Sequence, residues 1–307
     1  MASRVRWQLL HATAAASVTA CAAVFALIPL VVGTVPAAQP ATASGNAATG
    51  VGLQLVRSAT VRIEYAGTVF LVDPMLAEAE AYPGIAGTHD AHLRYPRVGL
   101  PMSLEQAMEA DAVVLTHLHP DHWDTVARER LPKSIPVFVQ DEADARSVRA
   151  DGFTDVRVFD DTVFRGTRLY RTGGQHGTDT HIQAAGEALG KVSGVVFQRD
   201  GYKSVYVAGD TTWHPEVEAA IARHRPDVIV LNAGDARIAG LDGSIIMGRD
   251  DLARARRAAP DAAIVAVHLE AVNHATQSRD DLHRYIRSQG LDATWTLVPE
   301  DGDAYRF

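Results

Sequence analysis

The sequence predicts a mixed α/β protein built from two halves, and three observations support this class. The chain opens with β-type runs at residues 53–56, 60–65 and 68–72. A similar pair of runs recurs at residues 194–198 and 204–208. Elsewhere, short apolar runs alternate with segments of helical period, the order expected when strands and helices pack in layers.

Each pair of β-type runs is joined by a short turn and leads into an acidic residue. Residues 66–67, Ala-Gly, are typical of a two-residue hairpin turn, and the strand that follows them runs out into Asp73. Residues 199–201, Arg-Asp-Gly, separate the second pair, whose last strand leads to Asp210. The second hairpin is therefore a weak internal echo of the first.

The alternating segments divide into strands and helices. Strands are expected at residues 112–115, 137–139, 228–231 and 264–267, and helices at residues 122–130, 142–150, 250–258 and 278–288. Residues 78–99 hold aromatics, glycine, proline and histidine without a clear period, so they are expected to form a long loop. Long loops in compact domains often cover active sites.

The composition restricts the partners of the protein. The chain of 307 residues holds 29 Lys and Arg against 37 Asp and Glu, a net charge of −8. This balance offers nothing to attract a phosphate backbone, so we expect no nucleic-acid partner. The single cysteine, Cys21, precedes the folded domain, so His and carboxylate side chains would have to hold any metal there.

Residues 1–43 resemble a targeting leader. Arg4 and Arg6 precede an uncharged run rich in Ala, Val and Leu at residues 12–33. The run exceeds most signal-peptide cores and is long enough to span a bilayer, so a signal peptide and a membrane anchor are both open. Small residues at 41–43 favour cleavage before Ser44. Either alternative predicts an exported protein, extracellular or attached through residues 12–33 to the outer side of the cytoplasmic membrane.

A short linker separates this leader from the folded part. Residues 44–50 belong to a small, polar stretch whose composition cannot bury enough apolar surface to offset the entropy of ordering. We therefore expect a flexible linker at 44–50 and one folded domain at 51–307. The sequence leaves the oligomeric state undefined.

Four residues of metal-binding type fall within six positions. His117 and His119 follow the buried strand expected at 112–115, and in extended geometry their side chains leave the same face. Asp121 and His122 open the expected helix, which turns a second pair of ligands toward a neighbouring position. The spacing therefore predicts a metal site with room for more than one ion.

This run resembles the signature of the metallo-β-lactamase superfamily. The resemblance covers nearly all of residues 51–307 and implies an αββα sandwich, with metals at one edge of its two sheets. Carried over position by position, it implies that His176, Asp210 and His268 complete the ligand set. One metal would lie on His117, His119 and His176, a second on Asp121, His122 and His268, with Asp210 between them.

The chemistry of these ligands agrees with the resemblance. Imidazole and carboxylate suit zinc, manganese or iron, and three ligands for each ion leave room for water. We therefore expect two divalent ions, zinc before manganese or iron. Two such ions would share a hydroxide that attacks the substrate, and Asp121 and Asp210 are the residues expected to serve catalysis directly.

Several histidines and one further aspartate have alternative interpretations. His274 competes with His268 for the last ligand position, but only His268 comes directly after a strand. His181, His214 and His274 could hydrogen-bond to ligands or transfer protons, or serve only loop packing. Asp73 could support the metal site or simply form an Asp-Pro turn. His224 and His283, in charged helical stretches, are expected on the surface.

The resemblance also bears on the reaction. The string Leu-Thr-His-Leu-His-Pro-Asp-His-Trp-Asp at 115–124 is similar to the superfamily branch of the ascorbate-phosphate lactonase and the N-acyl-phosphatidylethanolamine phospholipase D. This implies a metal-dependent hydrolase of an ester, lactone or phosphodiester bond in a small molecule. The alternatives are hydrolysis of a β-lactam or other amide, and a non-catalytic exported metal-binding protein. Substrate choice would depend on loops such as 78–99 and 175–189.

Overall fold

The computed structural model describes residues 50–307. The leader expected at 1–43 and the linker expected at 44–50, apart from its last residue, lie outside this part of the chain. Within residues 50–307, no helix combines the length and the apolar character that crossing a bilayer requires.

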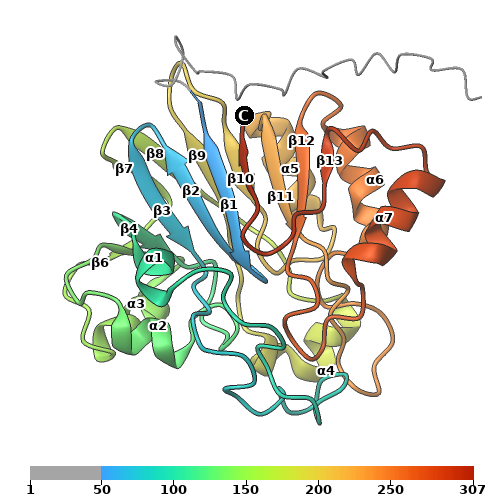
Figure 1. The fold of residues 1–307 in the computed structure, drawn as a ribbon, viewed down its shortest axis with the longest axis horizontal. Coiled ribbons are helices and arrows are strands. Elements are labelled where there is room, and N and C mark those ends of the chain that lie inside the picture. Colours follow the sequence, from blue (N-terminus) through green and yellow to red (C-terminus); the bar gives the residue numbers. More distant parts are fainter. Residues whose placement is uncertain (1–49) are drawn as a thin grey trace, which may run out of the picture. The chain divides into compact units, whose positions relative to one another are not determined.

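Two seven-stranded sheets form the centre of the domain (Figure 1). The first sheet has the order β14-β1-β2-β3-β4-β5-β6. Its strands are β1 (Gly52–Arg57), β2 (Thr60–Tyr65), β3 (Thr68–Val72), β4 (Ala112–Val114), β5 (Val137–Val139), β6 (Val156–Val158) and β14 (Ala304–Arg306). The second sheet has the order β13-β12-β11-β10-β9-β8-β7. Its strands are β7 (Asp161–Phe164), β8 (Thr167–Thr172), β9 (Gly194–Gln198), β10 (Val205–Val207), β11 (Val228–Asn232), β12 (Ala263–Val267) and β13 (Thr296–Leu297).

The internal echo seen in the sequence extends to whole sheets. In the first sheet, β14, β1, β2 and β3 pair antiparallel, and β3, β4, β5 and β6 pair parallel. In the second sheet, β7 to β10 pair antiparallel and β10 to β13 pair parallel. Strand β3 therefore corresponds to β10, and each leads to an acid: Asp73 follows β3 directly, and Asp210 lies three residues beyond the end of β10.

Helices cover the outer face of each sheet. Helices α1 (Leu104–Met108), α2 (Thr125–Arg130) and α3 (Glu142–Ala150) bury apolar residues against the first sheet. Helices α5 (Pro215–His224), α6 (Arg249–Ala258) and α7 (Arg279–Ser288) do the same for the second. A separate apolar core lies between the sheets, where the rings of Phe70 and Phe197 pack edge to face at 5.0 Å. The layers are helix, sheet, sheet, helix, as the expected αββα sandwich requires.

The first hairpin follows the turn chemistry of its sequence. Ala66 and Gly67 both have positive φ, at 51° and 76°, which is the conformation of a two-residue turn that matches the twist of its strands. Residues Val61 to Tyr65 then pair in register with Val72 to Thr68. The hairpin delivers Asp73 to the end of β3.

Two local expectations need correction. The helix expected at 122–130 begins only at Thr125, because Asp124 is its N-cap and accepts a hydrogen bond from the backbone of Ala127 at 2.7 Å. The segment 175–189 is not a loop throughout, since α4 (Asp179–Leu189) occupies most of it. The loop at 78–99 is confirmed: it contains no helix or strand, only isolated bridges from Tyr82 to Tyr95 and from Thr88 to Ile238.

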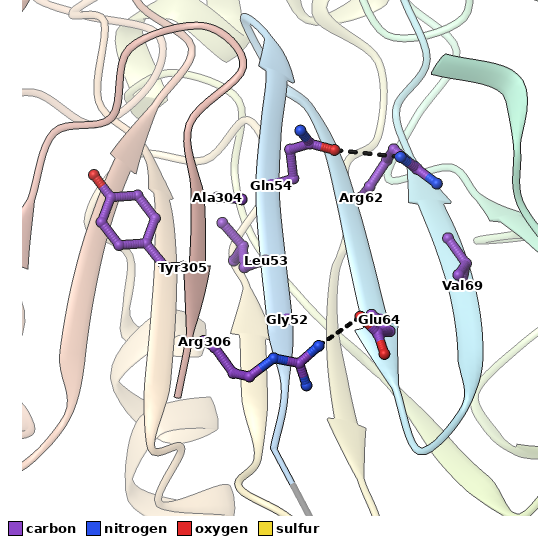
Figure 2. A pocket seen from close by; sticks show the side chains of 9 residues that line it. All are labelled: Gly52, Leu53, Gln54, Arg62, Glu64, Val69, Ala304, Tyr305 and Arg306. Atoms are coloured by element: carbon purple, nitrogen blue, oxygen red, sulfur yellow. Dashed lines mark hydrogen bonds and ion pairs between the residues drawn. The ribbon is translucent and has the colours of Figure 1, made fainter. Parts of the chain in front are cut away.

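A hollow of about 300 Å³ lies on the outer surface of the first sheet (Figure 2). Gln54, Arg62, Glu64 and Arg306 line it, and Arg306 reaches Glu64 at 2.8 Å. This hollow contains no histidine, and its polar side chains pair with one another across β14, β1 and β2. We therefore place the functional site elsewhere, at the edge where the parallel strands end.

Candidate metal centre

The residues expected in the site come mainly from strand ends. Asp73 follows β3, Asp210 follows β10 and His268 follows β12, while His117 lies three residues beyond β4. The carboxyl ends of parallel strands lie at one edge of a sheet, and here the edges of both sheets face the same end of the molecule as α4 and the segment 78–99 (Figure 1). The fold therefore gathers side chains that are far apart in the sequence.

The segment from His117 to His122 turns sharply after the strand. The backbone amides of His122 and Trp123 both donate to the carbonyl of His119, each at 2.9 Å. This turn places His117 and His119 on one side, with ring centroids 4.5 Å apart, and carries Asp121 and His122 past them. The local motif thus supplies ligand atoms to two neighbouring positions.

The structure forms both groups of three that the resemblance implies. His117, His119 and His176 offer nitrogens that lie within 4.8 Å of one another. Asp121, His122 and His268 form a second such group, in which His268 Nε2 lies 3.4 Å from Asp121 Oδ2 and 3.1 Å from His122 Nε2. A third group with the same property consists of Asp73, His117 and His122.

Asp210 lies between the first two groups. Its Oδ2 atom is 3.2 Å from His122 Nε2, 3.5 Å from His268 Nε2, 3.6 Å from His176 Nε2 and 4.0 Å from His117 Nε2. One carboxylate oxygen therefore approaches members of both groups. All seven side chains expected as ligands gather in one small volume.

Neighbouring residues orient this cluster, and one of them was not singled out from the sequence. Asn232, the last residue of β11, donates from Nδ2 to Asp210 Oδ1 at 2.7 Å. Asp73 accepts from the amide and hydroxyl of Thr116 and from His122 Nδ1, the last at 2.9 Å. A polar residue at the end of a buried strand, the rule that selected His268, would also have selected Asn232.

Hydrogen bonds on the far side of each ring set which nitrogen faces the cluster. His176 Nδ1 donates to the carbonyl of Ile245 at 2.9 Å, and His119 Nε2 donates to the carbonyl of Ala188 at 3.0 Å. The opposite nitrogens, Nε2 of His176 and Nδ1 of His119, are then left as acceptors. Such outer partners fix the tautomer of a metal-binding histidine and raise its basicity.

Backbone strain accompanies the last ligand position. His268 has a φ of 62°, a left-handed conformation that costs a residue with a side chain about 1–3 kcal/mol. Its carbonyl passes so close to Gly234 that a Cβ there would lie 2.1 Å from the carbonyl oxygen. Glycine is therefore required at position 234 for the strand end to place His268 in the cluster.

The charges of the cluster fall into two sets. Burial opposes ionisation of Asp121 and Asp210, yet facing histidines hold the pKa of each well below its ordinary value. Burial also opposes protonation of His268, but Asp210 and Asp121 raise its pKa to about 9. Burial lowers the pKa of His176 to about 4. In the metal-free cluster the ionised carboxylates therefore lie beside two histidines of raised pKa, His122 and His268, and two of lowered pKa, His117 and His176.

Unsatisfied atoms in the cluster fit a divalent cation. His117 Nε2 and Asp121 Oδ2 are both buried, and neither has a hydrogen-bond partner in residues 50–307. A buried polar atom without a partner costs about 1–3 kcal/mol, and a metal ion held by each group would satisfy the unpaired atom of that group. The donor set of imidazole nitrogens and carboxylate oxygens suits zinc, manganese or iron.

The remaining histidines lie outside the two groups of three. His274 has a ring centroid 6.4 Å from that of His268 and is 5% exposed. His181 is buried in α4, and His214 is the N-cap of α5. His224 in α5 and His283 in α7 are half-buried rather than fully exposed.

A cavity of about 350 Å³ opens onto the cluster. Its floor includes His119, Asp121 and His176. Its walls come from the segment 85–88, from α4 and from the segment 238–245, and they are largely apolar. The loop expected to cover the site therefore does so, and α4 forms the opposite wall.

Fold and site together define a metal-dependent hydrolase of the metallo-β-lactamase superfamily. Residues 68–269 match the Beta-lactamase superfamily domain, and the chain belongs to this family. The chain is 45% identical over 254 residues to the UPF0173 protein YddR of Bacillus subtilis (strain 168), a match that takes in 82% of this chain and 98% of the relative.

Two solved structures resemble the whole domain. A possible metal-dependent hydrolase from Veillonella parvula DSM 2008 is 40% identical with a TM-score of 0.81, covering 84% of this chain and 99% of that one. An isothiocyanate hydrolase from Delia radicum gut bacteria is 41% identical with a TM-score of 0.80, covering 83% and 99%. The superfamily inferred from the motif at 117–122 is confirmed, whereas its narrower branch is not.

The prediction of a signal peptide or membrane anchor requires correction. It rested on the apolar run at 12–33, outside the described residues, and no helix within residues 50–307 could span a bilayer. The three relatives described above align over 98% or 99% of their own length with 82–84% of this chain. Their names refer to a hydrolase or to the UPF0173 family and mention neither export nor a membrane. We therefore withdraw the prediction of a signal peptide or membrane anchor.

Proposed function

We propose that this protein uses two divalent ions to hydrolyse a small, uncharged electrophile that carries an apolar substituent, an isothiocyanate before an ester or lactone. The observation that carries this proposal is the cavity over the cluster. Ile85, Ala185, Leu189, Ile238 and Ile245 contribute to its walls, and its lining contains no Lys or Arg. Such walls favour an apolar group and offer no side-chain cation to a negatively charged substituent that lies away from the ions.

This argument ranks the substrate classes. The proposed ions could balance the charge of a phosphodiester at the cluster itself, but the lining offers a negatively charged substrate no Lys or Arg beyond those ions. Substrates that carry a carboxylate, as many β-lactams do, face the same cost. Esters and lactones are uncharged and stay as the second candidate. The isothiocyanate hydrolase that is 41% identical over the whole domain supports placing isothiocyanates first.

The arrangement of the ligands supports two ions. His117, His119 and His176 would hold one ion, and Asp121, His122 and His268 the other, with Asp210 Oδ2 facing both. Zinc suits three ligands of this kind with one position left open. Ions in such a site lower the pKa of a water molecule and polarise the substrate atom on which negative charge develops.

The protein's own groups would orient the attack. Asp210, held by Asn232, can accept a hydrogen bond from the attacking water and thereby direct its lone pair at the substrate. For an isothiocyanate, water adds its oxygen to the central carbon and its protons pass to nitrogen. Cleavage of the carbon–nitrogen bond then gives an amine and carbonyl sulfide, which accounts for every atom of the reactants.

The test combines metal analysis with turnover. The full chain is purified, its metal content is measured, and hydrolysis of benzyl isothiocyanate, phenyl acetate, a γ-lactone, bis(p-nitrophenyl) phosphate and a penicillin is compared. We expect about two metal ions per chain and preference for the isothiocyanate. His117→Ala should lose metal and activity together, whereas the matched variant His283→Ala, on α7 away from the cluster, should retain both. Hydrolysis that survives both chelation and His117→Ala would refute the metal mechanism.

A further inference from the structure

The cavity over the cluster contains one polar side chain that is neither an expected metal ligand nor hydrogen-bonded within the loop. The polar residues of its lining are Thr88, His119, Asp121, His176 and His274. Three of these are the expected metal ligands described above. Thr88 is occupied in the loop, where its hydroxyl donates to the carbonyl of Ile85 at 2.6 Å and accepts from Asn273 at 2.9 Å. His274 is the remaining polar residue of the lining, and it is neither an expected metal ligand nor part of the loop's hydrogen bonds.

The backbone around His274 is firmly held. The carbonyl of His274 accepts from the amide of Arg237 at 3.1 Å. The preceding residue, Asn273, accepts from the amide of Ile85 at 3.0 Å and donates to the carbonyl of His89 at 2.8 Å. These bonds fasten the segment that follows His268 to the loop that walls the cavity, and they hold the backbone of His274, whose side chain contributes to the cavity lining.

The ring itself is not committed to any protein group. His274 is 5% exposed, and its Nδ1 atom is buried without a hydrogen-bond partner in residues 50–307. A neutral imidazole carries one donor and one acceptor, and here no protein group at Nδ1 dictates which nitrogen holds the proton. Burial lowers the pKa of His274 to about 4, so the ring is neutral near pH 7. An uncommitted buried polar ring costs stability, which suggests that a ligand completes its hydrogen bonding.

We infer that His274 is a catalytic residue that hydrogen-bonds the substrate heteroatom on which negative charge develops during attack. This inference rests on the proposed function and adds the one directional contact that the apolar walls lack. An isothiocyanate or an ester has a single polar centre, and attack transfers electron density onto a sulfur, nitrogen or oxygen attached to it. A donor fixed beside the metal cluster would stabilise that charge more than it stabilises the bound substrate.

Two substitutions at this position separate hydrogen bonding from packing. His274→Leu keeps an apolar side chain of similar bulk without a donor, whereas His274→Gln keeps an N–H donor. We expect His274→Leu to lower kcat about 100-fold with KM changed much less, and His274→Gln to restore at least about tenfold of that loss. Metal content should match the wild type in both variants, thermal stability should not fall below the wild-type value, and His283→Leu serves as the control outside the cavity.

The design separates this inference from the proposed substrate. The kinetic comparison is run on whichever panel substrate the wild type hydrolyses, so turnover of an ester instead of an isothiocyanate would count against the substrate proposal alone. Equal kcat losses in the Leu and Gln variants, or unchanged kcat in both, would overturn the role of His274. Loss of one metal ion in His274→Leu would also overturn it, because His274 would then be a ligand.

Discussion

The carboxylate of Asp73 accepts three hydrogen bonds in the protein interior: from the amide of Thr116 at 2.8 Å, from its hydroxyl at 2.7 Å and from His122 Nδ1 at 2.9 Å. The last of these directs His122 Nε2 toward Asp210. Asp73 therefore does more than form an Asp-Pro turn, because it also orients His122, an expected ligand of the second group. Outer partners of this kind contribute to metal affinity without touching the metal.

Asp73→Asn should weaken metal binding at the second group. The amide can present a donor to His122 Nδ1 in place of an acceptor, so the ring loses the contact that fixes its tautomer. We expect the affinity of the weaker-bound ion to fall about 10- to 100-fold, measured by titration of metal-free protein with zinc. The control is Asp90→Asn, an exposed residue of the loop. Identical zinc affinities in the two variants would contradict the assigned role of Asp73.

The histidines make the metal-free protein sensitive to pH in both directions. His274 is buried, with a pKa of about 4 in place of 6.5, so the unfolded chain takes up a proton first and stability falls as the pH drops from about 6.5 to about 4. His268, with a pKa raised to about 9, contributes stability below about 6.5 that is lost as the pH rises through 9. Stability from these groups is therefore greatest near the ordinary histidine pKa.

Urea unfolding of chelator-treated protein across this pH range tests the prediction. Stability of the wild type should decline on both sides of about pH 6.5. Because His274→Gln removes one group that titrates on the acid side, its decline toward pH 4 should be shallower while its alkaline side is unchanged. An acid decline of the same steepness in both proteins would show that His274 does not titrate as its burial implies.

At the scale of elements, Asp124 joins helix α2 to the start of the long loop. Its Oδ1 caps the helix at the amide of Ala127, and its Oδ2 accepts from the amides of Leu76 and Ala77 at 2.9 and 2.8 Å. The side chain is buried. The Asp124 carboxylate thus supplies hydrogen-bond acceptors both to an amide in the first turn of α2 and to amides of the segment that follows β3.

Asp124→Ala should destabilise the domain by about 3 kcal/mol, because it removes a cap worth about 1 kcal/mol and leaves buried amides without acceptors. The free energy of unfolding in urea measures this, and Asp141→Ala is the matched control. Asp141 is also an N-cap, of α3, but it is partly exposed and caps only its own helix. A loss at Asp124 no larger than at Asp141 would argue against the link between helix and loop.

The sequence predicted those elements whose local and tertiary preferences agree. Turn residues 66–67 and the β-type runs beside them give the same hairpin in sequence and structure. Helix α4 escaped prediction because only His181 and Leu189 are buried along it and Ala185 interrupts its helical geometry, so it lacks a regular apolar face. Its position depends on contacts with the cluster, through the carbonyl of Ala188, that no local pattern encodes.

The same distinction applies to the site. The run from His117 to His122 is local and could be recognised directly, and the resemblance supplied His176, Asp210 and His268. A strand-end rule could have selected Asn232, and His274 was one of three histidines with a possible role beside the ligands. What each one contacts, Asp210 or the cavity, emerged only in three dimensions. The substrate cavity combines three separate segments, which explains why sequence alone did not define its apolar character.

On the scale of the whole molecule, the cluster bridges the two halves of the domain. His117, His119, Asp121 and His122 follow β4 of the first sheet, whereas His176, Asp210 and His268 follow β8, β10 and β12 of the second. The group of His117, His119 and His176 and the group of Asp121, His122 and His268 each contain at least one residue from either half. Ions bound there would therefore stabilise the packing of one sheet against the other as well as the reaction.

Removal of metal should thus lower the melting temperature of the entire domain in one cooperative transition. Binding at a free zinc concentration about 1,000-fold above Kd stabilises the folded state by about 4 kcal/mol, which for a domain of this size corresponds to about 10 °C. His117→Ala and His176→Ala disrupt the same group from opposite halves, so each should lose most of this difference, and the double variant should lose little more. Differential scanning calorimetry with and without chelator measures all three. If the losses in melting temperature add up in the double variant, or if two separate transitions appear, the ions stabilise only local loops. If the double variant loses no more than each single variant, and chelator lowers its melting temperature no further, the ions stabilise the packing of the two sheets.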